Sequence, residues 1–426
     1  MLTRRALIAS SAALAAGCGP FRSSVDLPSL PQPVALTWHV MPSIYFRRAG
    51  QNVQMPRDVL PQIAAALEGD AEDPNGPARG RYTLTGHALE NPEPSPRSTE
   101  EFAEWIGGIE SDIMVVDAWM ARGLGEQGVL LPLDRFIASD EPDLTDTFYP
   151  FVLEQFRGNR GLYALPLSAE PLMLHYDARY FAQQGVPPVD ETWDWDALVE
   201  HAVKLTRRYD DGTVMRWGLM SHMYGIWWAL WQNEAEMFDL ATGQCRLQEP
   251  AATEALRFCH DLLHTHRVSP TRGALDLVQN FNPPSGSWPA MSYIPYQSLW
   301  WPGYRWAELP EGNVRSVPVT ADLGLAIHTQ TKHTEAAYTA LKGLLNALQR
   351  FVHVPAQRDA VARLEEFHPT LQPEEATALQ RSMEHGHALP YNSIGPTMYQ
   401  IVDDLARGAN VAAVANGACA FLQEHS

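Results

Sequence analysis

The side chains best suited to chemistry in this sequence are acidic and aromatic residues that follow short apolar runs. Asp117 and Trp119 come directly after the run 113–116, and Trp38 stands near the end of the run 34–40. Ligands of open α/β sheets bind beyond the carboxyl ends of strands. The Asp117 carboxylate could accept two hydroxyl groups while the Trp119 indole stacks on an apolar surface. The alternative is a capped turn with core aromatics, and core packing is equally well supported for Trp38.

A dense aromatic group lies farther along the chain. Trp227 and Trp231 are four residues apart and therefore share one face of a helix, whereas Trp228 points elsewhere and is expected in the core. Tyr224 precedes them by about one turn. We take Tyr224 and Trp227 as candidate ligand contacts. The alternative, a buried aromatic stripe, accounts for at least half of the group.

The segment 290–304 is richer in polar and aromatic side chains than a plain core segment. Pro295, Pro302 and Gly303 argue against a regular helix, and loops on a rigid scaffold commonly carry recognition residues. The candidate contacts here are Tyr296, Gln297, Trp300, Trp301 and Tyr304.

Other motifs do not predict catalysis, a metal or a cofactor. Gly123, Gly125 and Gly128 fit G-x-G-x-x-G, but they run into the apolar stretch 129–133 where a dinucleotide site needs a helix to begin. Gly128 therefore indicates the end of a helix. The histidine pairs 264/266 and 385/387 lack neighbouring Cys or acids at ligand spacing. Asp194 and Asp196 suit a helix start rather than an acid pair.

The N-terminus has the pattern of an export signal. Arg4 and Arg5 precede an apolar stretch, 6–16, which is shorter than the about 20 residues that span a bilayer. Small residues then lead to Cys18, in a pattern that resembles the bacterial lipoprotein lipobox, although Ala15 stands where Leu is usual. We expect removal of residues 1–17, lipidation of Cys18 and a flexible tether over 18–33. Ordinary cleavage with an unmodified Cys is the alternative, and either the Sec or the twin-arginine route is open.

Composition bounds the function further. The chain has 426 residues and a net charge of −19, which disfavours nucleic acid and anionic lipid as partners. Beyond Cys18 only Cys245, Cys259 and Cys419 remain, so one disulfide is possible and a disulfide framework is not.

Apolar periodicity predicts an α/β protein. Strand-like runs at 34–40, 82–85 and 113–116 alternate with helix-like stretches at 56–67 and 99–109, which implies βαβ units and a mostly parallel sheet. An exposed loop is expected at 69–81. Later segments repeat the alternation. Strands are expected at 162–165, 172–176 and 323–327, and helices after Thr192 or Asp194, around 255–263 and after a cap at Thr334.

Three stretches resemble the extracellular solute-binding proteins of ABC importers, in their carbohydrate-binding branch. They are 111–117 with 125–134, then 161–170 with 174–181, and finally 324–328 with 332–337. The resemblance implies a two-lobe periplasmic-binding-protein fold of type II, with mixed sheets, flanking helices and a hinge. It places one lobe at 34–168 plus 323–368 and the other at 169–322 plus 369–426.

The family implies capture of a sugar or oligosaccharide by lobe closure and its delivery to the permease subunits of an ABC importer. The similar proteins place a ligand-contacting acid where Glu170 stands, although a solvated loop acid is the alternative. Tyr391 and Tyr399 resemble the family's last contact segment. A monomer held to the membrane only by its lipid, outside the cytoplasm, is expected.

Two other classes stay open at this point. Aromatic residues with acids also suit a secreted glycoside hydrolase. A binding protein for a non-sugar solute is the other class. A polyol phosphate would need a cluster of basic residues, and the candidate contact segments offer only Arg305. A polyamine would need several acids around the aromatic residues, and the main candidates are only Asp117 and Glu170. A neutral saccharide is therefore favoured.

Overall fold

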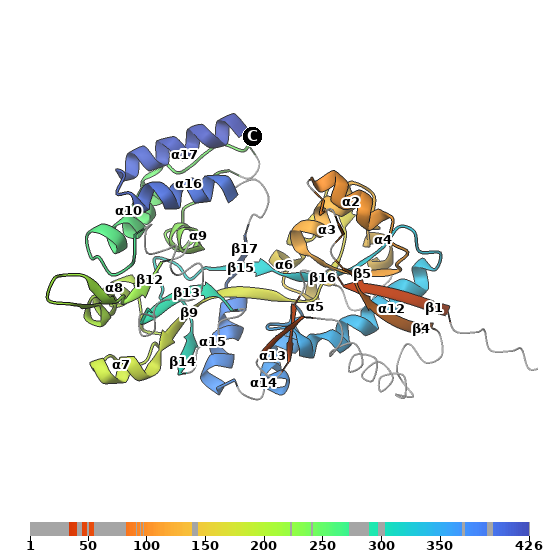
Figure 1. The fold of residues 1–426 in the computed structure, drawn as a ribbon, viewed down its shortest axis with the longest axis horizontal. Coiled ribbons are helices and arrows are strands. Elements are labelled where there is room, and N and C mark those ends of the chain that lie inside the picture. The colour runs from red at the N-terminus through yellow and green to blue at the C-terminus, as the bar shows by residue number, and fades with distance from the viewer. Residues whose placement is uncertain are drawn as a thin grey trace, which may run out of the picture.

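In a computed structural model of the protein, two large β-sheets stand out among the described residues, each at the centre of one lobe (Figure 1). The expected signal segment 1–17, tether 18–33, helix 56–67 and loop 69–81 lie outside the described residues. The structure describes residues 34–40, 45–48, 51–54, 82–90, 92–93, 95–96, 98–138, 144–221, 224–239, 242–271, 289–296, 303–368, 371–389 and 395–425.

The first sheet has the strand order β4-β1-β5-β16-β8. Its strands are β4 (Tyr82–Ala88), β1 (Val34–Val40), β5 (Ile113–Asp117), β16 (Leu323–Ile327) and β8 (Leu165–Pro166). The predicted strands at 34–40, 82–85, 113–116 and 323–327 are confirmed. β1 is parallel to β4 and β5, but β16 is antiparallel to β5 and β8, so the sheet is mixed. The reason is that β16 enters from the other lobe.

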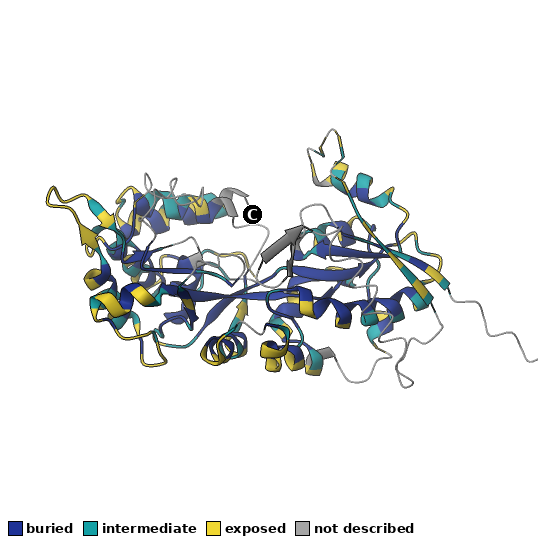
Figure 2. Cartoon of the chain, turned by 60° about the horizontal axis from the view of Figure 1, so that its bottom comes forward, coloured by how far each residue is buried: buried dark blue, intermediate teal, exposed yellow. Residues whose placement is uncertain are grey.

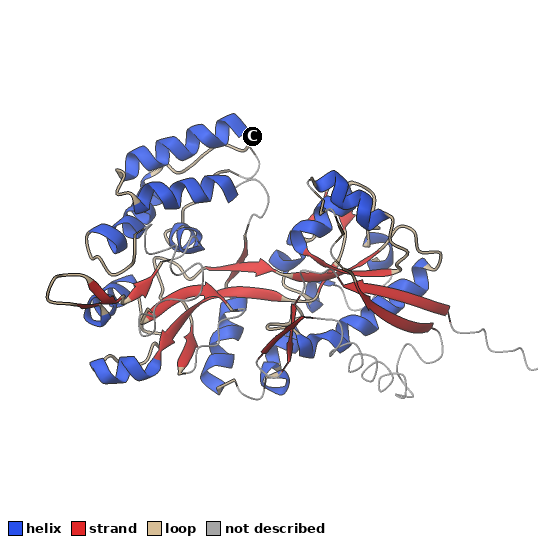
Figure 3. Cartoon of the chain, viewed as in Figure 1, coloured by secondary structure: helices blue, strands red, loops and turns tan. Residues whose placement is uncertain are grey.

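Helices cover this sheet, as Figure 3 shows. The prediction of a cap at Thr334 is wrong by one residue, because the N-cap of its helix is His333, without a side-chain cap bond. The helical segments in these parts of the chain are α2 (Thr99–Gly107), α3 (Ala118–Glu126), α4 (Asp134–Ile137), α5 (Leu144–Thr147), α6 (Pro150–Gln155), α12 (Thr334–Leu348), η1 (Gln349–Phe351), α13 (Arg358–Ala362) and α14 (Leu364–Phe367). Of these, α6 packs mainly against the strands 317–321 and 386–388 of the second sheet.

The second sheet has the order β12-β13-β9-β15-β17, with β14 also paired to β9. Its strands are β12 (Leu219–Met220), β13 (Met291–Pro295), β9 (Ala169–Asp177), β15 (Val317–Ala321), β17 (Gly386–Ala388) and β14 (Tyr304–Ala307). Three small antiparallel pairs lie outside the two large sheets: β2 (Tyr45–Arg48) with β3 (Gln51–Gln54), β6 (Arg157–Gly158) with β7 (Gly161–Leu162), and β10 (Arg207–Arg208) with β11 (Val214–Arg216).

Four helices of the second lobe, at 224–232, 250–264, 395–406 and 411–425, build a hydrophobic cluster separate from the main one. Asp194 caps α8 by accepting from the backbone N of Ala197 at 2.8 Å, which confirms the predicted helix start. Cys245 and Cys419 form a disulfide, and Cys259 is a buried free thiol. The helices are α7 (Ala178–Gln184), α8 (Trp195–Leu205), α9 (Tyr224–Gln232), α10 (Pro250–His264), α15 (Pro373–Glu384), α16 (Gly395–Ala406) and α17 (Val411–His425).

Strands connect the two lobes directly. β9 begins at the lobe junction, and β15 passes into β16 with only Asp322 between them (Figure 1). The main hydrophobic cluster continues through both sheets, and Figure 2 shows buried strands along the whole length of the body. Within the part of the chain that the structure describes, every helix is too short or too polar to cross a membrane.

Candidate functional site

Asp117 occupies the strand end expected for a ligand-contacting acid. It is the last residue of β5 and the N-cap of α3, yet its side chain makes no capping hydrogen bond. The expected alternative, a capping role, therefore does not account for the carboxylate. Trp119 lies in the first turn of α3, and its side chain is outside the described residues.

Trp38 is on β1 with 2% of its surface exposed, inside the main hydrophobic cluster. Its ring packs among the other members of that cluster. The packing alternative considered for Trp38 thus describes its position.

The aromatic group of α9 is also largely enclosed. Trp227 and Trp231 contact each other with ring centroids 5.1 Å apart, and the Trp231 indole donates to Glu236 at 3.0 Å. Trp228 is fully buried, as expected, and its ring contacts Tyr293 of β13. Tyr224 begins α9, and its side chain is outside the described residues.

The segment 290–304 differs from the expected loop at both of its ends. Tyr304 is in β14, where its hydroxyl donates to the carbonyl of Pro289 at 2.6 Å. Tyr296 is buried, and its ring is 4.7 Å from that of Trp306. Both tyrosines therefore serve packing here. Burial and strand pairing with β9 are long-range effects that the local composition did not reveal.

Of the remaining predicted ligand contacts, one is exposed and four lie outside the described residues. Tyr399 is on α16 with 59% of its surface exposed. Four predicted contacts lie outside the described residues: Gln297, Trp300, Trp301 and Tyr391.

Three acidic side chains at the lobe junction have raised pKa values. Burial and, to a lesser extent, the charge of Asp322 together raise the pKa of Asp117 to about 7. Burial raises the pKa of Asp322 to about 6. Burial and the charge of Asp322 raise the pKa of Glu170 well above its ordinary value. No cation of the described residues contributes to any of these three shifts.

Glu170 is the most enclosed member of this group. It has 1% of its surface exposed, and neither carboxylate oxygen has a hydrogen-bond partner among the described residues. Thr320 stands directly opposite Glu170 across the β9–β15 pair, and its hydroxyl also lacks a partner there. Buried polar groups are normally hydrogen-bonded, so two such neighbours need an explanation.

Strand geometry tells which way Glu170 points. Residues four apart on a strand share a face, so Glu170 is on the same face as Leu174. Leu174 is paired with Tyr293, whose ring contacts Trp228 of α9 at 5.1 Å. Glu170 and Thr320 therefore point to the side of the sheet that α9 covers.

Asp322 is the residue that the sequence interpretation missed. Its backbone joins the lobes, because its N–H donates to Ser168 at 3.2 Å and its carbonyl accepts from Ala118 at 3.1 Å. A lone acid between two fully buried five-residue strands was the available signal. An ionisable side chain inside so long an apolar run needs a specific reason to be there.

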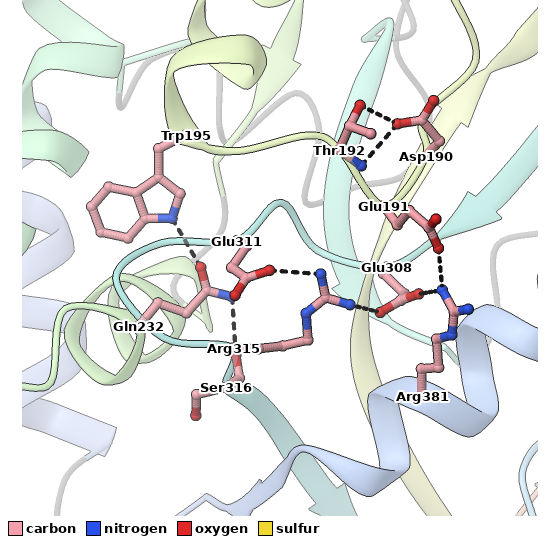
Figure 4. Close-up of polar contacts among 10 residues, drawn as sticks. All are labelled: Asp190, Glu191, Thr192, Trp195, Gln232, Glu308, Glu311, Arg315, Ser316 and Arg381. Carbon is pink, nitrogen blue, oxygen red and sulfur yellow. Dashed lines mark hydrogen bonds and ion pairs between the residues drawn. The ribbon is translucent and has the colours of Figure 1, made fainter.

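A second polar group of this lobe has all its charges paired (Figure 4). Arg315 contacts Glu308 at 2.6 Å and Glu311 at 2.8 Å, and Arg381 contacts Glu191 at 2.7 Å and Glu308 at 3.3 Å. The network ties the loop after β14 to α15. Its carboxylates already have cationic partners, in contrast to Glu170.

A cavity of about 640 Å³ lies beside this network, between β14, α15 and the loop 188–192. Its buried acid, Glu375, accepts from the backbone N atoms of Trp306 at 3.1 Å and Gln372 at 3.0 Å. This cavity therefore contains no unsatisfied carboxylate of the kind found at the lobe junction.

The glycine-rich stretch 123–128 behaves as the sequence predicted. Gly128 has φ +78° just after α3, which confirms it as a helix-ending glycine and not part of a dinucleotide loop. Within the described ranges, no group of three or more His, Cys, Asp or Glu side chains could hold a metal ion.

Comparison with known proteins identifies the fold. Residues 106–256 match the family of bacterial extracellular solute-binding proteins. An ABC substrate-binding protein from Listeria monocytogenes, in complex with cycloalternan, is 15% identical with a TM-score of 0.64, covering 92% of this chain and 98% of its own.

Two further structures are similar over the same share of this chain, 92%. The cyclic α-maltosyl-1,6-maltose binding protein from Arthrobacter globiformis is 16% identical with a TM-score of 0.64 and is covered completely, 100%. UgpB from Mycobacterium tuberculosis, in complex with glycerophosphocholine, is 17% identical with a TM-score of 0.62 and is covered to 98%. The predicted resemblance and the two-lobe periplasmic-binding-protein fold are confirmed.

Proposed function

We propose that this chain, which carries the family match of bacterial extracellular solute-binding proteins over residues 106–256, captures a sugar or oligosaccharide by lobe closure. It then delivers the solute to the permease subunits of an ABC importer. The observation that carries the proposal is the two-lobe fold, shared along 92% of the chain with proteins solved in complex with saccharides. Family and neighbours are binding proteins.

The lobe division expected from the sequence is part of this proposal. We assign 34–168 plus 323–368 to one lobe and 169–322 plus 369–426 to the other. The strand composition of the two sheets supports this division, because each sheet draws its strands from one set of ranges. The chain then crosses at the start of β9, at Asp322 and after α14, and closure is a rotation about these crossings.

The saccharide would lie beyond the end of β5, between the lobes. Asp117 offers two acceptor oxygens from the first lobe, since no capping bond engages them. Stacking would come from Trp119, just after the end of β5, and from Trp300, Trp301 and Tyr391, which the sequence predicts as ligand contacts. An aromatic face with carboxylate acceptors suits a ring that is apolar on its faces and hydroxylated at its rim.

The cellular arrangement is also a proposal. Cleavage before Cys18 and lipidation of that residue would hold a monomer on the outer side of the cytoplasmic membrane. The tether 18–33 would span at most about 58 Å when extended, which leaves the body free to approach the permease. The extracellular character of the family supports an extracytoplasmic location.

Pure binding without turnover is proposed over hydrolysis. A hydrolytic pair needs one proton donor and one base or nucleophile flanking the scissile bond. Glu170 is enclosed on the α9 side of its sheet, so it is poorly placed to share one bond with Asp117. Incubation with the best-bound oligosaccharide, followed by chromatography, tests this, and release of shorter products would contradict it.

Binding is tested by a thermal-shift screen over mono- and oligosaccharides, followed by calorimetry and small-angle scattering. We expect at least one saccharide to raise the melting temperature and to reduce the radius of gyration. Asp117→Ala and Trp300→Ala should each weaken its binding by about tenfold or more. Tyr209→Ala, on the exposed hairpin β10–β11, is the matched control and should bind as the parent protein does.

No saccharide response in either measurement would refute the proposal. Unchanged affinity in both site variants would leave saccharide binding in place and refute only the location of the site.

A further inference from the structure

The lobe junction concentrates acidic groups without a compensating charge. Asp322 raises the pKa of both Asp117 and Glu170, so its charge acts on both of the other carboxylates. By contrast, the acids of the Arg315–Arg381 network all contact guanidinium groups. The acids of the lobe junction therefore differ from those of this network, because no ion pair is found for them among the described residues.

Glu170 supplies an independent sign of a missing ligand. Both of its oxygens are buried without a hydrogen-bond donor, and the opposite Thr320 hydroxyl is likewise unengaged. A carboxylate can accept about four hydrogen bonds, so Glu170 and Thr320 together form a cluster of unused acceptors on the α9 side of the sheet. An ionised carboxylate in such a place is costly unless it is both paired and hydrogen-bonded.

We propose that Glu170, with Thr320 opposite it and the charge of Asp322 nearby, forms a subsite for a protonated amino group, so that the captured solute is an amine-bearing saccharide. This inference rests on the proposed function and names the class of its ligand. An ammonium group supplies both what the acids lack, a positive charge, and what Glu170 lacks, N–H donors. A neutral hydroxyl group supplies only a donor.

Other ligand chemistries fit the junction less well. A phosphate would face three carboxylates and no described cation. A quaternary ammonium carries the charge but has no N–H for Glu170 and Thr320. A metal ion would need three ligands in mutual reach, and no such group exists in the described part of the chain.

Calorimetry in amine-free phosphate buffer at neutral pH tests the inference with matched probes. The pairs are D-glucosamine against D-glucose, and the β-1,4-linked glucosamine dimer against cellobiose. Choline is the quaternary probe, and 3,3-dimethylbutanol is its neutral isostere. We expect the amino sugar with the higher affinity to bind at least about tenfold more tightly than its neutral partner. Choline should bind no more tightly than its neutral isostere.

Glu170→Gln keeps the shape of the side chain and removes its charge, so it should abolish the preference for the amine while neutral saccharides still bind. Asp322→Asn should reduce the preference. Asp211→Asn, at an exposed hairpin turn, is the matched control and should leave it unchanged. Circular dichroism and the melting temperature establish that each variant is folded.

Equal or weaker binding of both amines relative to their neutral partners would overturn the inference, and so would a preference that survives Glu170→Gln. Either result leaves saccharide capture intact if neutral sugars bind. The proposed function fails separately, when no sugar of either kind produces a response.

Discussion

Replacing Asp322 by Asn should stabilise the ligand-free protein near neutral pH. The side chain is largely buried between β15 and β16, and burial raises its pKa from 3.8 to about 6. The folded state therefore binds this proton more tightly than the unfolded state does. Stability from this group is complete below the unfolded pKa and is lost as the pH rises through 6.

The size of the effect follows from the two pKa values. A difference of one pKa unit corresponds to about 1.4 kcal/mol, so ionising Asp322 in the folded protein costs about 3 kcal/mol above pH 7. At pH 4 the destabilisation caused by ionisation of Asp322 is less than about 1 kcal/mol, because the side chain stays protonated in the folded protein. Asn has nearly the same shape and never ionises. The gain of Asp322→Asn over the parent should therefore grow between pH 4 and pH 7.5.

Urea denaturation followed by tryptophan fluorescence, at both pH values and in amine-free buffer, measures this difference. The same variant should lower the pKa of Asp117 in a carboxyl NMR titration, because one cause of its elevation is removed. Asp211→Asn is the control. Asp211 is fully exposed with a pKa lowered by Thr213, so its replacement should bring no gain at neutral pH. A gain for Asp322→Asn that is equal at both pH values, or absent at pH 7.5, would refute the electrostatic reasoning.

Two further predictions concern stability. Replacing Cys245 and Cys419 by Ala should lower the free energy of unfolding by about 2–4 kcal/mol, since the disulfide joins positions 174 residues apart. An unchanged urea midpoint under oxidising conditions would contradict this prediction. Arg315→Ala should lower the free energy of unfolding by about 2 kcal/mol, because Glu308 and Glu311, at 2.6 and 2.8 Å from the guanidinium group, lose their cation. This value lies between those typical of exposed and of buried ion pairs. Arg363→Ala, whose side chain is 49% exposed, is the control and should change the urea midpoint little.

The sequence by itself determined the local elements and the class of fold. Apolar runs predicted the strands that became β1, β4, β5 and β16, because the side chains with which a strand packs against the core must be apolar. Asp194 predicted the start of α8 because an N-cap acts within three residues. The ordered family segments predicted the two lobes. Asp117 could be found as a candidate because strand ends are visible in the sequence.

Only the tertiary structure decided which distant residues meet. The pairing of Cys245 with Cys419, the antiparallel entry of β16 and the capture of Tyr304 into β14 all depend on chain crossings that leave no local pattern. The group of Asp117, Glu170 and Asp322 is the clearest case. Each residue is an isolated acid in the sequence. The effect of Asp322 on the pKa of the other two arises only because β5, β9 and the β15–β16 connection reach the lobe junction together. Electrostatic coupling depends on distance in space and on burial, and neither is encoded in residue spacing.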